Sequence, residues 1–259
     1  MTVYKRDLDG QLNDILTILG TTTPHLFPFW EKTGQLVTGI SIADLIPSET
    51  AGAAEDLEHD FAPLLLPCGL YSYHFHPTGD HHLAGIDHAD LSFAGTGGMS
   101  LGAWIRPTTV TNNCIMAKYD VAGTDREWRL WLDAASKLDF EMYDDTANAS
   151  EIAISAATDI TKGQMQFVVA TYDGTAATPT VYLYVNGTAV NDGSTAETGL
   201  FVDMIPGATP LTVGCSGVTA TPTFEFHGRI ALPFITGKAL TAANVASLYK
   251  ITLPMIGLC

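Results

Sequence analysis

The alternation of side chains is clearest between residues 163 and 187, where the sequence is GQMQFVVATYDGTAATPTVYLYVNG. Residues 167–172 and 181–185 each alternate at every second position and are rich in β-branched and aromatic types, which is typical of β-strands. The dipeptides DG and NG follow the two segments as turns, because Gly and Asn tolerate the positive φ of tight turns. Both faces of each strand are apolar, so we expect a central strand pair that is covered on both sides.

Similar short patterns predict strands through much of the remaining chain. They fall at residues 70–76, 100–107, 114–119, 127–133, 137–143, 151–155, 211–214 and 224–235. The segments between them are rich in Gly, Asp and Asn, which favour turns. Short strands at this spacing predict an all-β sandwich or barrel.

Two helices are predicted outside these strands. An apolar stripe predicts a helix over residues 7–19, with Asp7 as its N-cap and Gly20 as its C-terminal stop. A second, short helix is predicted at residues 241–249, where Thr241 can cap the N-terminus. The apolar positions are Leu8, Leu12, Ile15, Leu16 and Leu19 in the first helix and Val245, Leu248 and Tyr249 in the second.

Residues 1–68 form a predicted N-terminal arm, and residues 69–259 form the β domain. After its helix the arm contains TTTPHLFPFWEK, in which two prolines favour an extended chain that carries large apolar side chains. One helix and one aromatic segment cannot enclose a core, so the arm must dock on the main domain or on another subunit, and both alternatives stay open. The side chains predicted to make this assembly contact are Leu12, Leu16, Phe27, Phe29 and Trp30.

Charge narrows the classes of partner. The net charge is −16 with only 12 basic residues, which disfavours nucleic acid and anionic membranes because both need a cationic face. No apolar stretch is long enough for a membrane span. The first residues, MTVYKRDLDGQL, lack the apolar core of a secretory signal, so we expect synthesis in the cytoplasm. The four cysteines lie far apart and are expected to be free thiols.

Several segments, taken in order, carry a family resemblance. They are HADLSFAGTGGMSLGAWIRP, IMAKYD, REWRLWLD, FVVATYDG, LYVNG and GRIALPFITGKALTAANVASLY. With these segments the sequence resembles a laminin-G-like jelly roll of the concanavalin A superfamily over about residues 70–250, which implies two stacked antiparallel sheets with a short helix near the end. One departure is Met165-Gln166, where such sequences usually have Trp-His before the valines.

With its N-terminal arm, the chain also resembles standalone jelly-roll proteins encoded among the virion genes of tailed phages. This resemblance implies a non-enzymatic structural component of a phage particle, such as a capsid decoration protein on the virion surface. Its partners would be capsid or other virion proteins and further copies of itself, in an expected trimer. The alternative is a lectin-like module that binds cell-surface glycans, and fold alone does not decide between these functions.

Metal binding is a weaker hypothesis, and no cofactor is expected, with calcium left open. His74 and His76 project from one face of a predicted strand, a spacing that can hold a metal. Loop carboxylates are the usual calcium ligands of related folds, but no EF-hand spacing occurs. The acidic candidates in predicted loops are Asp120, Asp125, Asp144, Asp145 and Asp173.

Acidic residues alternate along the predicted strand 137–143, where Leu138, Phe140 and Met142 are expected to face the core. Asp139 and Glu141 are expected to face outward. A glycoside hydrolase needs two carboxyls close together in a cleft, but an amphipathic surface strand shows the same alternation, so no catalytic residue is expected. Four aromatic residues are candidates to stack on sugars, namely Trp104, Trp128, Trp131 and Tyr143. At least Trp104 and Trp128 are expected instead to lie in the core.

Overall fold

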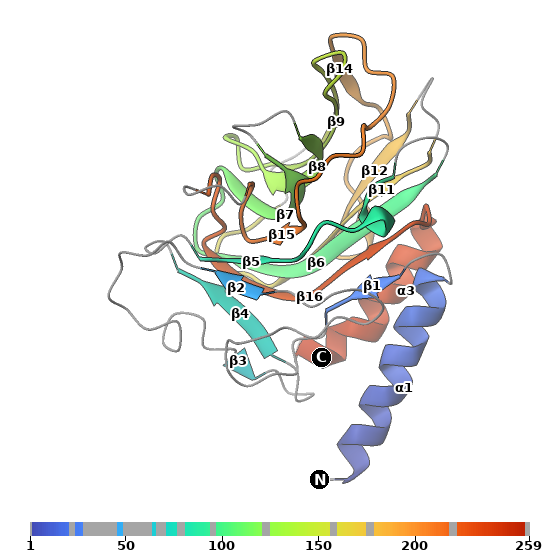
Figure 1. The fold of residues 1–259 in the computed structure, drawn as a ribbon. Coiled ribbons are helices and arrows are strands. Elements are labelled where there is room, and N and C mark those ends of the chain that lie inside the picture. The colour runs from blue at the N-terminus through green and yellow to red at the C-terminus, as the bar shows by residue number, and fades with distance from the viewer. Residues whose placement is uncertain are drawn as a thin grey trace.

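The chain forms a two-sheet antiparallel sandwich with helices against one side (Figure 1). The computed structural model describes residues 2–20, 24–27, 46–48, 64–65, 71–76, 81–93, 97–120, 125–155, 160–174, 179–217 and 222–256. The predicted all-β jelly-roll architecture with an N-terminal helix and a short C-terminal helix is confirmed. The boundary predicted near residue 68 lies outside the described residues.

The first sheet runs in the order β13-β12-β11-β6-β16-β4-β3, and β1 also pairs with β16. Strand order departs from sequence order because the chain crosses repeatedly between the two sheets. The bounds are β1 His25–Leu26, β3 Leu64–Leu65, β4 Tyr71–Phe75, β6 Met99–Pro107, β11 Gln166–Tyr172, β12 Val181–Val185, β13 Thr188–Ala189 and β16 Gly228–Thr236.

The second sheet runs in the order β14-β10-β9-β8-β7-β15-β5-β2. The bounds are β2 Ile46–Ser48, β5 His82–Ala84, β7 Asn113–Tyr119, β8 Arg126–Leu132, β9 Leu138–Asp144, β10 Ala149–Ile154, β14 Ala196–Thr198 and β15 Thr212–Val213. Strands β8 and β9 form the predicted hairpin, with the turn at residues 134–136. The strands that the sequence did not predict are only two or three residues long, too short to show a period.

The main core lies between the two sheets. Leu138, Phe140 and Met142 of β9 point into it, as the alternation predicted. Asp139 and Glu141 lie on the opposite face of β9, as predicted. They are buried, however, and the expectation that they face solvent was wrong. Trp128 belongs to the main core, and Trp104 is equally buried on the other side of the first sheet, so both predicted core tryptophans are confirmed.

The described helices are α1 (Thr2–Leu19) and α3 (Ala242–Thr252), with the short helices η1 (Ala89–Leu91) and η2 (Leu253–Ile256). α1 and α3 contact each other and lie along the outer side of the first sheet (Figure 1). Within the described part of the chain, neither helix is both long and apolar enough to cross a membrane.

The ends of the two helices test the capping residues that the sequence predicted. Gly20 ends α1 with φ +93° and its N–H donates to the Leu16 carbonyl at 3.0 Å, and Thr241 caps α3 in a capping box with Asn244, both as predicted. The start of α1 was predicted wrongly, because the helix begins at Thr2 and Asp7 lies inside it. Gly10 does not break the helix.

The helices bury a second apolar cluster against the first sheet. Leu12, Ile15 and Leu19 of α1 pack in it with Trp104, Phe167 and Leu248 among others. Strand β11 is therefore buried along its length, as predicted, whereas β12 is covered only in part, because Tyr182 is 39% exposed and the strand lies beside the two-residue edge strand β13. The cluster makes α1 part of the domain's own packing.

The described side chains that were predicted to make an assembly contact pack against other parts of their own chain. Leu12 and Phe27 are buried and Leu16 is half-buried, while Phe29 and Trp30 lie outside the described residues. Thr236 Oγ1 and Lys238 Nζ donate to the carbonyls of Leu19 and Ile18 at 2.8 and 2.9 Å, which ties the end of α1 to the domain. A role of these side chains in assembly stays a prediction.

Candidate functional site

The outer face of the first sheet is only partly covered by helices. α3 packs over the turn after β12, where a Cβ on Gly187 would lie 3.1 Å from Tyr249. The helix begins at Ala242, and beyond this point no described helix covers the outer face of the sheet. Tyr184 is 3% exposed on the covered side, whereas Tyr182, two residues away, is 39% exposed. The uncovered strip forms a groove of about 430 Å³.

The floor of the groove comes from β11 and β12. Tyr182 and Thr171 are paired across these strands, and the rings of Tyr182 and Tyr184 are 6.4 Å apart at 42°. Burial raises the pKa of Tyr184, and a hydrogen bond with Thr171 opposes the shift. The floor therefore presents the exposed ring of Tyr182 beside the buried ring of Tyr184.

The Tyr182 ring is supported from the loop after β13. Gly193 has φ +82°, and a Cβ there would lie 2.7 Å from the ring. Only glycine combines this backbone conformation with such a close approach. The ring is thus held in place before any ligand arrives, which reduces the entropy lost on binding.

The two sides of the groove differ in character. Ala239, Leu240, Thr241 and Ala242 form a largely apolar wall at the start of α3. Leu240 is 3% exposed, and the Thr241 hydroxyl donates to Asn244 Oδ1 at 2.9 Å. Asp173 and Thr180 lie at the polar end, where Asp173 Oδ1 accepts a hydrogen bond from the Thr180 amide at 3.2 Å. A concave, largely apolar surface with few polar groups is the usual form of a small-molecule site.

The outer face of the second sheet, which carries the acidic alternation, is closed by its own side chains. Arg129 Nε donates to Glu141 Oε2 at 2.6 Å, and the guanidinium stacks over the rings of Trp131 at 4.0 Å and Tyr119 at 4.5 Å. Phe224, with a strained φ of +53°, packs its ring 5.3 Å from that of Trp131. Trp131 and Tyr143, the remaining predicted sugar platforms, are therefore packed within this cluster.

Asp139 is the most perturbed acid of this face. Burial, and then the charge of Glu141, raise the pKa of Asp139 to about 8. The nearby Trp131 indole opposes this rise in the pKa. Among the described residues, neither Trp131 Nε1 nor Asp139 Oδ1 has a hydrogen-bond partner of good geometry. Asp139 and Glu141 are 3% and 6% exposed, so this carboxyl pair is not open to a polysaccharide chain.

The metal candidates are not brought together. The rings of His74 and His76 are 5.9 Å apart in a T-shaped contact, and His81 Nδ1 accepts from the His76 amide. Asp144 caps the turn at Thr146 and Asp145 pairs with Arg126, while the Asp120 amide donates to the Asp125 carbonyl at 3.2 Å. Across the described ranges, no group of three or more His, Cys, Asp or Glu side chains is arranged to hold a metal ion.

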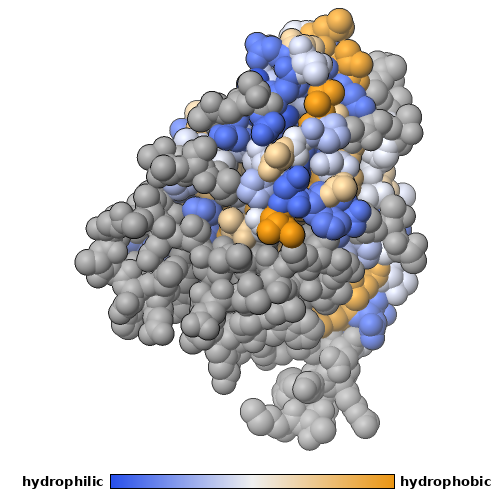
Figure 2. Space-filling view, viewed as in Figure 1, coloured by the Kyte–Doolittle hydropathy of each residue, from blue (hydrophilic) through white to orange (hydrophobic). Residues whose placement is uncertain are grey.

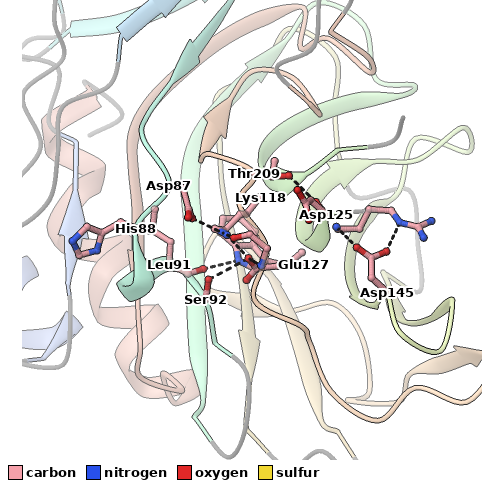
Figure 3. A network of polar contacts seen from close by, with 12 residues as sticks. Asp87, His88, Leu91, Ser92, Lys118, Asp125, Glu127, Asp145 and Thr209 are labelled. Carbon is pink, nitrogen blue, oxygen red and sulfur yellow. Dashed lines mark hydrogen bonds and ion pairs between the residues drawn. The ribbon is translucent and has the colours of Figure 1, made fainter. Parts of the chain in front are cut away.

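The most buried ionic cluster connects strands of the second sheet to neighbouring loops. The Lys118 ammonium group lies among Glu127, Asp87 and the Gly207 carbonyl (Figure 3). Glu127 Oε1 also accepts from the Gly207 amide at 2.8 Å and from Ser92 Oγ at 3.1 Å. These contacts join β7 and β8 to two long connections. Of the described cysteines, Cys114 and Cys215 are buried and form no disulfide.

A separate apolar surface lies at the end of the sandwich near β14 (Figure 2). Leu200 and Val202, which follow this edge strand, are 72% and 57% exposed. Phe201 between them is buried. These side chains do not line the groove, so they provide a control surface for binding experiments.

Two stacked antiparallel sheets connected in this order define a jelly-roll sandwich. The family model described as Concanavalin A-like lectin/glucanases superfamily, of the laminin-G type, matches residues 80–246. The chain belongs to this family. A search of curated proteins finds no match.

Solved structures share the fold at low sequence identity. Domain 4 of AbnA, an extracellular GH43 arabinanase from Geobacillus stearothermophilus solved with arabinotriose, matches with a TM-score of 0.53 and 15% identity over 87% of this chain and 97% of that one. The binding domain of botulinum neurotoxin serotype G matches with a TM-score of 0.59 and 14% identity over 90% and 51%.

A type C botulinum neurotoxin structure, whose title names interaction with two ganglioside molecules, matches with a TM-score of 0.59, 13% identity and coverage of 90% and 52%. The chain spans about half the length of these neurotoxin domains. At such identities the likeness shows the fold alone.

The sequence did not single out the groove. Tyr182 and Tyr184 were recognised only as one face of a strand, and no local signal shows which of two such residues a distant helix covers. The apolar wall comes from residues 239–242, more than fifty positions away. Aromatic residues at the edge of a covered face are the signal that could have pointed to it.

Proposed function

We propose that this chain is a non-enzymatic, lectin-like domain that binds carbohydrate in the groove beside Tyr182. The observation that carries the proposal is the open, pre-positioned Tyr182 ring on a sheet face that helices otherwise cover. Aromatic rings supply apolar contact area at low entropic cost, and Asp173 and Thr180 at the polar end can bond to hydroxyl groups. The arabinotriose complex of a domain with the same fold supports this class of ligand.

The closed second sheet supports a binding role over a hydrolytic one. Retaining hydrolysis needs one carboxylate as nucleophile and one acid at a bond exposed in a cleft. Here Arg129 neutralises Glu141, and Asp139 is enclosed. Conversion of this pair into a working site would require the aromatic cluster to open.

We further propose that the domain is displayed on the surface of a phage particle, as a capsid decoration or equivalent component that contacts host glycans. The resemblance of the sequence to phage jelly-roll proteins and the net charge of −16, which limits nonspecific association, support this role. Immunogold labelling of purified intact particles with antibodies against the chain is the direct test. Labelling only after disruption would contradict surface display.

Glycan-array screening followed by calorimetric titration tests the binding function. Tyr182→Ala should weaken binding of any captured oligosaccharide by about fivefold, since an aromatic contact contributes on the order of 1 kcal/mol. Tyr182→Phe, which keeps the ring, and Leu200→Ala, which alters the separate apolar surface, should bind as the unaltered protein does. An array without any captured glycan, or a captured glycan indifferent to Tyr182→Ala, would overturn the proposal.

A further inference from the structure

We infer that Arg106 and Arg229 form a binding site for a tetrahedral oxyanion, the phosphate or sulfate ester group of a ligand. This site is separate from the groove and goes beyond the proposed function. Three features of the first sheet support it, which are the register of three neighbouring strands, the contacts of the two guanidinium groups and their charge.

The two arginines lie directly opposite each other on neighbouring strands. Strand β16 lies between β6 and β4 in the first sheet (Figure 1). Arg229 of β16 is in register with Arg106 of β6 on one side and with His74 of β4 on the other, and residues so placed have Cβ atoms about 5 Å apart on one face. This is the outer face, because Trp104, which shares the alternation of Arg106, packs there in the second apolar cluster.

Neither arginine forms an ion pair with a carboxylate among the described residues. The other arginines of the described strands, Arg126 and Arg129, each have such a partner, at 2.7 and 2.6 Å. Arg106 Nε instead donates to the Gly163 carbonyl at 2.7 Å, which holds the guanidinium and leaves its terminal nitrogens for a ligand. Arg229 is half-buried, and burial, followed by the charge of Arg106, lowers its pKa.

The charges of this pair are unfavourable without a ligand. Like charges directly opposite each other destabilise a sheet. The chain has only 12 basic residues and a net charge of −16, yet two of its few cations face each other here without a counter-ion from the described chain. A bound anion would replace this repulsion with two attractive contacts.

The geometry favours a tetrahedral anion. A guanidinium presents a planar fork of N–H donors that matches two oxygens of a phosphate or a carboxylate. One fork satisfies a carboxylate, whereas the oxygens of a phosphate or sulfate group point in several directions and can be shared between two forks. A phosphate monoester carries a charge of about −1.5 to −2 at pH 7, which two guanidinium groups offset, so we expect phosphate to bind more tightly than sulfate.

The site lies apart from the groove. Thr171 of the groove floor is in register with Ser100, which lies near the opposite end of β6 from Arg106. Ser100 and Arg106 are on the order of 20 Å apart along an extended strand. Failure of anion binding would therefore leave the proposed groove function intact, and failure of glycan binding would leave this site intact.

Titration of the full, ¹⁵N-labelled chain tests the site through the arginine Nε–H signals in NMR spectra. Inorganic phosphate, inorganic sulfate and acetate are compared at one ionic strength, set with sodium chloride. Phosphate and sulfate should shift the signals of Arg106 and Arg229 in a saturable way, and acetate should bind at least about fivefold more weakly than phosphate. Glucose 6-phosphate, glucose 6-sulfate and glucose then show which ester the site accepts.

Variants assign the binding to this pair. Arg229→Gln should weaken phosphate binding at least about fivefold, and Arg229→Lys, which keeps the charge but loses the fork, should have an intermediate effect. Lys137→Gln, which removes the same charge just before β9 in the second sheet, is the matched control and should leave the titration unchanged. Without added anion, Arg229→Gln should be at least as thermally stable as the unaltered protein, because it removes a like-charge contact.

Three results would overturn the inference. They are signals that respond to phosphate and sulfate no more than to chloride, acetate binding as tight as phosphate binding, and a phosphate titration indifferent to Arg229→Gln. A loss of stability in Arg229→Gln with phosphate binding unchanged would show that this arginine serves the fold alone.

Discussion

The ammonium group of Lys118 and the carboxylate of Glu127 form an ion pair in which both side chains are fully buried. The pair joins β7 to β8, and Glu127 also accepts hydrogen bonds from Ser92 and Gly207 on two long connections. Burial raises the pKa of Glu127, while the bonds from Gly207 and Lys118 oppose that shift. Each charge therefore offsets the cost of burying the other.

Replacement of Lys118 by Met should destabilise the protein strongly. The change leaves the Glu127 carboxylate buried without its counter-charge, which costs about 3–5 kcal/mol in comparable buried pairs. Urea denaturation followed by tryptophan fluorescence measures the loss. The double variant Lys118→Met/Glu127→Leu should recover most of it, because neither charge then remains.

Asp87 provides the control for this pair. Its carboxylate lies 3.0 Å from the Lys118 ammonium but is 43% exposed, so Asp87→Asn should cost only about 0–1 kcal/mol. Equal losses for Asp87→Asn and Lys118→Met would mean that burial does not set the strength of the pair.

Asp139 should make stability fall as pH rises. With a folded-state pKa of about 8 and an unfolded value of about 3.9, the folded protein binds more protons between these values, so the free energy of unfolding declines through this range. Asp139→Asn removes the titrating group. Relative to the unaltered protein, this variant should be more stable near pH 9 than near pH 5, by about 1.4 kcal/mol for each pH unit between pH 5 and the folded-state pKa.

The pH series for Asp139 is checked by denaturation at matched ionic strength. Asp133→Asn, in the adjoining turn, serves as the comparison variant. Parallel stability curves for Asp139→Asn and the unaltered protein would show that Asp139 titrates normally in the folded state.

Helix α1 should contribute to the stability of its own chain. Ile15 and Leu19 are 2% and 0% exposed in the second apolar cluster, so Ile15→Ala or Leu19→Ala should cost about 2–5 kcal/mol. Asp14→Ala, on the exposed side of the same helix, should change stability by less than about 0.5 kcal/mol. Thermal denaturation measures these differences.

Removal of the whole arm extends this test. A chain that begins at Gly69 lacks α1 and β1 and exposes the apolar residues of the second cluster, so we expect it to aggregate or to unfold more readily. Sedimentation velocity of both chains gives the answer. A folded monomeric truncated chain beside an oligomeric full-length chain would instead show that the arm serves assembly.

Cys114 should be inert in the folded protein. Burial raises the pKa of its thiol to about 12, and the thiolate is the reactive form. Iodoacetamide near neutral pH should leave Cys114 unmodified until urea unfolds the chain, as peptide mass spectrometry would show. Rapid alkylation under native conditions would contradict the enclosed position of this residue.

Much of the fold was predictable from local patterns. The alternation in β9 identified both the strand and the face that points to the core, and Thr241 identified the start of α3 through its capping bond. These signals are readable because side-chain direction and capping depend on residues a few positions apart. The closed state of Asp139 was not readable, since Arg129 and Phe224 come from other segments.

The sequence by itself determined the longer strands, the end of α1, the start of α3, the acidic character and the family, because periodicity, caps and composition are local or summed properties. Only the tertiary structure decided that Asp139 and Glu141 are enclosed, that Lys118 meets Glu127, and that Tyr182 stays open while Tyr184 is covered. The two tyrosines have equivalent places in the alternation. They differ because Tyr184 packs in the second apolar cluster with Val245 and Leu248 of α3, from a distant part of the chain, whereas Tyr182 does not.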